Sequence, residues 1–395
     1  MTKTSELPGF YRLDMAARRA RIAEVLGLAC AELDVVASGA GLSDAQADHM
    51  VENALGVMGL PLGLCVNLRV DGRDHLLPMA VEEPSVVAAC SYASKLLRAG
   101  GGVTAELTPP LMIGQIQVLD VPDPVTATAR VLGAKAELAS LANAGHKGLV
   151  SAGGGVVDVE VRRLEPMGPH DPCGPMLVVH LVVDVRDAMG ANAINTMCER
   201  LAPRIAALTG GRVGLRILSN LSDRRLVTVT GRVPIVELEG KGCESGLALA
   251  RGIEEASVFA ERDPYRAATH NKGIMNGVDA ALIALGQDWR AVEAGAHAHA
   301  AQSGRYRPLA TWRVDDGGAL HNHPSAQLAL ELAGVDHADR LAAIAGAAGL
   351  ATNLAALRAL ATEGIQHGHL ALHARVVARA AGATGELVDR VAAEL

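Results

Sequence analysis

The chain has 395 residues, half of them apolar, and a formal net charge of −7. This length can bury one large core or two to three smaller ones. The acidic balance and the few aromatic residues argue against a nucleic-acid surface, which needs a basic stripe and usually aromatic stacking platforms. Six scattered cysteines and an N-terminus without an apolar run indicate reduced thiols and a soluble, cytoplasmic protein with no membrane partner.

The first hundred residues predict helices around one hairpin. Apolar residues recur at helical spacing over residues 13–38, and Ser43 is a plausible cap for a helix that continues to about Gly56. Two apolar runs joined by the turn signal Asp71-Gly72 predict a hairpin. A further helix follows Glu83, over residues 86–97.

Residues 114–218 have a different pattern, in which β-branched runs alternate with helical spacing in the order β-α-β-β-α-β. That order is typical of a split βαβ, ferredoxin-like unit of ordinary domain size. Its turn at residues 184–192 leads from a strand into a helix, whose N-terminus suits a pyrophosphate. The predicted fold class is therefore α+β: a small domain at residues 109–219, inserted in a large, mainly helical domain made of residues 1–108 and 220–364.

The stretch Asp263–Gly277 carries polar and glycine residues too densely for an ordinary core element. Pro264 and two glycines punctuate it, so we expect an active-site loop. Arg266 is a fixed cation and Lys272 a tunable one, and together with an imidazole and two amides they suit an anionic ligand that carries a carbonyl group. A solvated connection between helices is the plainer interpretation of the same residues.

Four ionisable groups lie at breaks between predicted elements: Glu83, Lys272, Asp288 and His369. A lysine near two carboxyl groups can bring pKa values toward neutrality, and a mobile imidazole is the usual proton donor near pH 7. Ordinary roles are also open, because Glu83 can complement a helix dipole, Asp288 can be an N-cap and His369 can be a surface residue.

Three further motifs partly match known dinucleotide or metal sites, but the match is poor in each case. Gly240–Gly246 lacks the spacing of a dinucleotide fingerprint. The pairs His321/His323 and His369/His373 have metal-like spacing without an accompanying acid or cysteine set, so no metal site is expected.

Six segments together resemble the hydroxymethylglutaryl-CoA reductase family, and specifically its bacterial degradative class, class II. Each segment is weak alone, but all six occur in the right order over nearly the whole chain. They are Glu52–Gly56, Glu83–Ser85, His180–Asn192, Asp263–Gly277, Gln287–Glu293 and Gly364–His369.

The resemblance implies that HMG-CoA and mevalonate plus CoA are interconverted by two successive hydride transfers, in mevalonate catabolism. It implies that Lys272 holds the carbonyl oxygen, that Glu83 carries the proton of that oxygen, and that Asp288 tunes both pKa values. His369, on a C-terminal flap at residues 365–395, would protonate the CoA thiolate. The implied substrate-binding residues are Glu52, Ser85, Arg266 and Asn276.

By the same resemblance the inserted domain is dinucleotide-binding, and the active site is shared across a homodimer that can join a higher assembly of dimers. The implied cofactor-binding residues are His146, Asp187, Met189, Gly190 and Asn192. His146 stands where NAD-preferring relatives place an acid that repels a 2′-phosphate. Since the other features look degradative, we favour NAD(H), with NADP(H) as the alternative.

One departure from the family pattern concerns Leu320 and His321, between which the family carries a glycine-rich dinucleotide segment. That segment is either truly deleted or a mobile stretch missing from the sequence, and we favour the second. Two other functions stay open: a CoA-thioester hydrolase or acyltransferase, and a non-catalytic binding protein for CoA ligands. A hydrolase needs an activated nucleophile, and none of the cysteines lies in a motif that supplies one.

Overall fold

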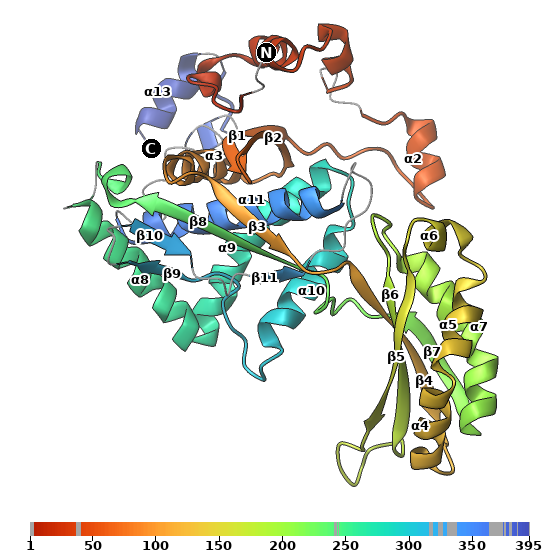
Figure 1. Ribbon diagram of the computed structural model, residues 1–395. Helices are drawn as coiled ribbons and strands as arrows, with labels where there is room; N and C mark the ends of the chain where they lie inside the picture. Colours follow the sequence, from red (N-terminus) through yellow and green to blue (C-terminus); the bar gives the residue numbers. More distant parts are fainter. Residues whose placement is uncertain are drawn as a thin grey trace.

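The computed structural model describes residues 4–36, 41–240, 243, 245–315, 319–322, 327–329, 338–362, 374, 377–378, 381–384 and 386–394. Over these ranges the chain forms two lobes, each with its own sheet and its own buried apolar core (Figure 1). The small lobe lies at the lower right of Figure 1 and the large lobe at the left.

The large lobe, expected to be mainly helical, also holds a sheet of seven strands in the order β2-β1-β3-β8-β10-β9, with β11 paired to β8. The predicted hairpin is present, and Asp71 and Gly72 turn it with positive φ angles of 49° and 74°. The strands are β1 (Leu62–Val70), β2 (Arg73–Ala80), β3 (Val103–Leu107), β8 (Leu226–Pro234), β9 (Trp312–Val314), β10 (Ala319–Asn322) and β11 (Gln327–Ala329).

The described helices of the large lobe are α1 (Met15–Leu26), α2 (Asp44–Met50), α3 (Pro84–Ala99), α8 (Gly246–Arg262), α9 (Pro264–Ala284), α10 (Trp289–Ala301), α11 (Ala338–Leu360) and α13 (Glu386–Glu394), with short 3-10 turns η1 (Phe10–Arg12), η2 (Cys30–Val36) and η3 (Ile235–Leu238). Helices α3, α8, α9, α10 and α11 pack around the sheet of this lobe, and its other helices lie farther out (Figure 1). Ser43 caps α2 as predicted, but α2 ends at Met50 instead of near Gly56. The chain beyond it lies exposed, and Asn53 adopts a left-handed φ of 59° that breaks the helix.

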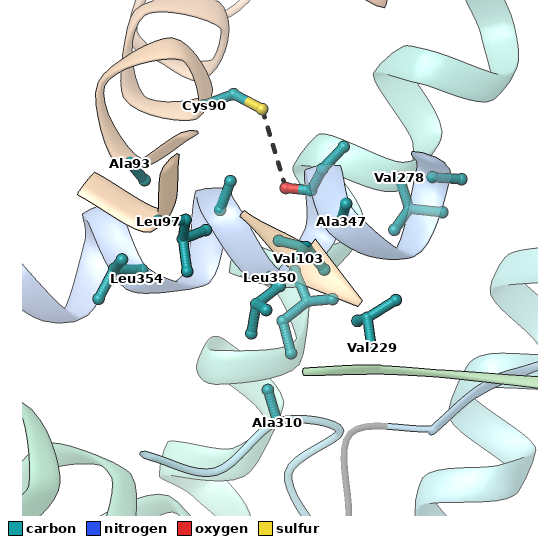
Figure 2. Close-up of a cluster of buried hydrophobic side chains, with 14 of the residues drawn as sticks. Cys90, Ala93, Leu97, Val103, Val229, Val278, Ala310, Ala347, Leu350 and Leu354 are labelled. Atoms are coloured by element: carbon teal, nitrogen blue, oxygen red, sulfur yellow. Dashed lines mark hydrogen bonds between the residues drawn. The ribbon is translucent and has the colours of Figure 1, made fainter. Parts of the chain in front are cut away.

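Helix α11 lies in the core of the large lobe. By length and composition alone it could cross a membrane, but 78% of the qualifying window is buried inside the structure. Figure 2 shows Leu350 and Leu354 of α11 close to Leu97 of α3. Helix α11 also packs tightly against α9, since a Cβ at Gly349 of α11 would lie 2.9 Å from Cγ2 of Ile274 of α9. Its burial therefore identifies α11 as a core helix.

The small lobe follows the predicted order of strands and helices. Its sheet has the order β5-β6-β4-β7 with every pair antiparallel, which is the arrangement that a βαββαβ chain produces. The elements are β4 (Leu111–Leu119), α4 (Pro124–Gly133), α5 (Lys135–Asn143), α6 (Lys147–Ser151), β5 (Gly155–Leu164), β6 (Met176–Asp184), α7 (Ala191–Thr209) and β7 (Arg212–Leu218). Two connections, at residues 108–110 and 219–225, join this lobe to the large one.

The stretch Asp263–Gly277 is not a loop, and that prediction was wrong. It forms the first part of α9, because the Asp263 side chain accepts hydrogen bonds from the backbone N–H groups of Tyr265 and Arg266, and Pro264 occupies the first helical position. Gly277 lies inside the helix because of packing: a Cβ there would be 2.6 Å from the Ala348 carbonyl oxygen of α11.

The chain passes through Leu320 and His321 as consecutive residues of β10. Leu320 pairs with Val233 of β8 and Val314 of β9, and His321 continues both ladders in register. The chain therefore forms a strand that is paired on both sides across this peptide bond.

Candidate active site

Three predicted site residues lie on α9 with their polar groups uncommitted. Lys272 is exposed, and Arg266 and Asn276 are half-buried. None of the three side chains makes a hydrogen bond or ion pair with another residue in the described ranges. Lys272 and Asn276 are one turn apart and therefore share a face of the helix. The helix thus presents an ammonium, an amide and a guanidinium that are available to an anionic ligand.

The imidazole and one amide of the same stretch face the core instead. Nε2 of His270 lies 2.9 Å from the Ala310 carbonyl oxygen, and burial, together with the nearby charge of Arg266, lowers the pKa of His270 to about 4. Asn271 is fully buried; it donates to the Arg307 carbonyl oxygen at 2.9 Å and accepts from the backbone N–H of Leu309 at 2.8 Å. These two residues hold α9 to the chain before β9 and do not belong to the site.

Glu83 and Ser85 form a second predicted part of the site. Glu83 is the N-cap residue of α3 and Pro84 occupies the first turn, so the helix begins at this point. The Ser85 hydroxyl donates to Oε2 of Glu83 at 2.5 Å, and both side chains are half-buried. A carboxyl group held by a hydroxyl at a helix N-terminus is a fixed acceptor and proton carrier.

Asp288 caps α10, where its Oδ1 accepts from the Ala291 backbone N–H at 3.2 Å. The helical stretch from Lys272 to Leu282 is about 15 Å long, and the Gln287 N–H bonds to the Leu282 carbonyl oxygen at 2.9 Å in a tight turn before α10. The structure therefore places Lys272 and Asp288 at separate points of the α9–α10 hairpin. Nothing in the described contacts brings them together within one copy of the chain.

Sequence reasoning missed Asp279, which shares the α9 face of Lys272 and Asn276. Burial and the negative charge of Glu293 on α10 raise the pKa of Asp279 from its ordinary 3.8 to about 7. Its Oδ1 is buried and has no hydrogen-bond partner among the described residues. The spacing i, i+4, i+7 from Lys272 was the available signal, but it appears only once the stretch is known to be a helix.

The turn between β6 and α7 holds the predicted cofactor residues Asp187, Met189 and Gly190, and Asn192 follows in the first turn of α7. Gly190 has a left-handed φ of 83°, and a Cβ there would lie 2.8 Å from both Sδ of Met112 and Cγ1 of Val185. The first backbone N–H groups of the long helix α7 follow it without an acidic residue in the first turn. A helix N-terminus opened by glycine fits the diphosphate of a dinucleotide.

A basic cluster lies on the same side of the small lobe. His146 is half-buried and precedes α6, and Lys147 is exposed beside it. Arg200 of α7 was missed from the sequence, but a Cβ at Gly145 would overlap its guanidinium, so glycine leaves the room that this side chain occupies. No residue in the described ranges pairs with Arg200. The three basic side chains can meet a phosphate.

The remaining predicted residues are isolated or outside the described ranges. Glu52 is exposed in the bend after α2. His369 and the first part of the flap, up to residue 373, lie outside the described ranges, as does His323, whereas α13 near the end of the flap is described. Over the residues that the structure does describe, no three His, Cys, Asp or Glu side chains gather closely enough to hold a metal ion.

Comparisons with known proteins agree on one family. The family model described as Hydroxymethylglutaryl-coenzyme A reductase matches residues 14–374. The 3-hydroxy-3-methylglutaryl-coenzyme A reductase of Archaeoglobus fulgidus is 48% identical over 405 residues, which cover 98% of this chain and 90% of the relative. A probable reductase of the same name from Borreliella burgdorferi is 33% identical over 82% of this chain and 76% of its own length.

Solved structures show the same likeness. A 3-hydroxy-3-methylglutaryl-coenzyme A reductase from Streptococcus pneumoniae superposes with a TM-score of 0.85 at 37% identity, covering 99% of this chain and 95% of that one. A class II structure from the same organism, bound to NADPH in open conformations, superposes with a TM-score of 0.83 at 38% identity, over 97% and 95% of the two chains. This chain belongs to the hydroxymethylglutaryl-coenzyme A reductase family, in its prokaryotic form.

Proposed function

We propose that this protein interconverts HMG-CoA and mevalonate plus CoA by two successive hydride transfers with a nicotinamide cofactor, and that it works in the degradative direction in the cytoplasm. The observation that carries the proposal is the set of uncommitted donors on α9, Arg266, Lys272 and Asn276, on a chain that also holds Glu83 against Ser85. A thioester reduction needs such groups, because negative charge develops on one carbonyl oxygen at each step.

The roles follow from the chemistry of each side chain. The Lys272 ammonium stabilises the developing oxyanion, and Glu83, held by the Ser85 hydroxyl, moves the proton to and from that oxygen. Arg266 binds the carboxylate of the substrate as a bidentate donor, with Asn276 and Ser85 at its hydroxyl. Asp288 tunes the two pKa values, and Glu52 and His369 keep the substrate-binding and thiolate-protonating roles that the resemblance implies. The cofactor, when bound at the β6–α7 turn, supplies the hydride.

A second copy of the chain would complete this site. Lys272 lies on α9 and Asp288 caps α10, and no contact between their side chains is described within one copy. The chain between α2 and β1 runs with its apolar side chains in solvent, with Leu55 105% and Met58 86% exposed. Apolar side chains exposed to this degree mark an interface. We therefore expect a homodimer with shared active sites, in which residues 109–219 act as the cofactor domain.

The cofactor choice that we favoured from the sequence, NAD(H), gains no support, since a relative binds NADPH. Arg200, His146 and Lys147 would attract the 2′-phosphate of NADP(H), so we propose that both cofactors are accepted. Arg200→Ala should raise KM for NADPH about tenfold while it leaves KM for NADH within about twofold. Arg204→Ala is the control. Arg204 lies on α7 like Arg200, but its guanidinium already donates to Glu137 of α5 at 2.7 Å. Equal changes for both cofactors would remove Arg200 from this role.

The direct test follows nicotinamide absorbance in both directions, with HMG-CoA plus NADH or NADPH and with mevalonate, CoA and the oxidised cofactors. We expect turnover in both directions. Release of free CoA without any change in nicotinamide absorbance would instead identify a thioester hydrolase. If the folded protein changes neither absorbance nor free thiol, the reductase proposal fails.

A further inference from the structure

The side chain of Asp187 joins the cofactor turn of the small lobe to the large lobe. Oδ1 of Asp187 accepts a hydrogen bond from the backbone N–H of Ala338 at 2.9 Å. Ala338 is the first residue of α11, so this N–H is one of the groups that a helix leaves unsatisfied at its N-terminus. Asp187 therefore caps the central helix of the large lobe from a position 151 residues away in the sequence.

Both connections between the lobes meet the first turn of α11, where Pro110, Arg225 and Asp339 line one pocket. Only the two connections at residues 108–110 and 219–225 lead into the small lobe, and the buried Arg225 reaches from the second of them to Sδ of Met112 at 3.5 Å. On the other side of the first turn of α11 a cleft of about 380 Å³ separates Arg340 from Arg73 and His75 of the hairpin. The first turn of α11 is thus open on the side of the hairpin and held on the side of Asp187.

We propose that Asp187 is a positioning residue that latches the small lobe to α11, so that cofactor binding at the β6–α7 turn and the order of the first turn of α11 reinforce each other. The proposal rests on the proposed function for its second half only, since the latch itself exists without cofactor. Asp187 and Gly190 belong to one turn, and a cofactor that orders this turn also favours the state in which the carboxylate caps the helix. By linkage the capped state in turn favours the cofactor.

The Asp187 side chain is well suited to this contact. A carboxylate at a helix N-terminus meets both an unsatisfied N–H and the positive end of the helix dipole. Asn192 follows in the first turn of α7, and its exposed side chain makes no described contact with the large lobe. Asp187 therefore has a role in capping α11 that Asn192 lacks, although both residues are predicted to bind the cofactor.

The experiment measures amide hydrogen exchange of the peptide that covers residues 338–345, in the full chain with and without NADPH. Asp187→Ala should speed exchange of this peptide about fivefold without cofactor, the factor expected when a helix loses its N-cap. Asp187→Asn keeps an acceptor oxygen and should exchange like the wild type. In the wild type NADPH should slow the exchange further, and in Asp187→Ala it should not.

Two control variants isolate the latch from general damage. Asp123→Ala removes the N-cap of α4 within the small lobe and should loosen α4 only. Asn192→Ala should weaken NADPH binding and leave residues 338–345 unchanged without cofactor. The latch is overturned if Asp187→Ala, shown to be folded by circular dichroism, exchanges like the wild type, or if Asp187→Asn is as fast as Asp187→Ala. If NADPH does not bind the wild type at all, the proposed cofactor site fails, while the exchange without cofactor still decides the latch.

Discussion

Helix α9 and the β6–α7 turn are both polar stretches that contain glycine, but glycine has opposite roles in the two. In the turn, Gly190 has a positive φ and opens the N-terminus of a helix, so glycine there serves the backbone conformation. In α9, Gly277 is helical and serves close packing, because the Ala348 carbonyl oxygen of α11 occupies the place of a Cβ. The same residue type marks a break in one stretch and a tight contact in the other.

The polar residues divide in a similar way. In α9, Lys272 and Asn271 are neighbours in the sequence, but one side chain is exposed and the other is fully buried. Successive residues of a helix point about 100° apart, so a run of polar residues necessarily supplies both the site and the core. Density of polar residues therefore locates a functional element without saying which of its residues act.

The largest effect should come from Lys272→Ala. If Lys272 holds the developing oxyanion as we propose, its loss should lower kcat by about 10²- to 10³-fold or more. The melting temperature should stay close to that of the wild type, because an exposed side chain contributes little to stability. Steady-state assays and thermal denaturation measure the two quantities. Lys95→Ala, an exposed lysine on α3, is the control and should keep both. Near-full activity of Lys272→Ala would show that the roles are misassigned.

Asn271→Ala tests a polar residue of α9 that is buried in the core. It removes two hydrogen bonds and leaves the Arg307 carbonyl and the Leu309 N–H without their partner, so we expect a loss of about 2–4 kcal/mol in the free energy of unfolding. Chemical denaturation of this variant and of Thr269→Ala, an exposed position on the same helix, makes the comparison. A loss of activity at unchanged stability would move Asn271 into the site.

How far the sequence predicted the molecule depended on whether a signal was local. The small lobe was predicted in full order, since alternating strand and helix periods are local patterns, and so were the Asp71-Gly72 hairpin and the Ser43 cap. Asp263-Pro264 is equally local and marks a helix start, but it was interpreted as loop punctuation. The place of Arg200 beside Gly145 and the cap that Asp187 gives to α11 depend on contacts between distant segments, which no local pattern encodes.

The two glycines of α9 give a smaller and sharper test. Gly277→Ala places a methyl group 2.6 Å from the Ala348 oxygen and should destabilise the protein by about 1–3 kcal/mol through overpacking. Gly273→Ala meets only Cβ of Ala356 at 4.0 Å, so it should stabilise the helix by up to about 1 kcal/mol through its better helix propensity. Opposite signs in thermal denaturation are expected. If both variants lose stability alike, close packing is not the reason for Gly277.

A further effect should be a pH dependence of stability that depends on Asp279. Burial and the charge of Glu293 raise its pKa to about 7, well above the ordinary 3.8. Between these two values the folded protein keeps the proton that the unfolded chain has lost, so the stability contribution of Asp279 is fully present below about pH 3.8 and is lost as the pH rises through about 7. Asp279→Asn cannot ionise, and it should therefore gain melting temperature relative to the wild type as the pH rises from 4 to 7, with no further gain above pH 8. Glu293→Gln removes the charge that raises the pKa of Asp279. In a protein that retains Asp279, the loss of stability with rising pH should therefore end at a lower pH than in the wild type. A difference between Asp279→Asn and the wild type that does not change with pH would mean that Asp279 is already ionised in the folded protein, and would leave the α9 face with a permanent charge beside Asn276.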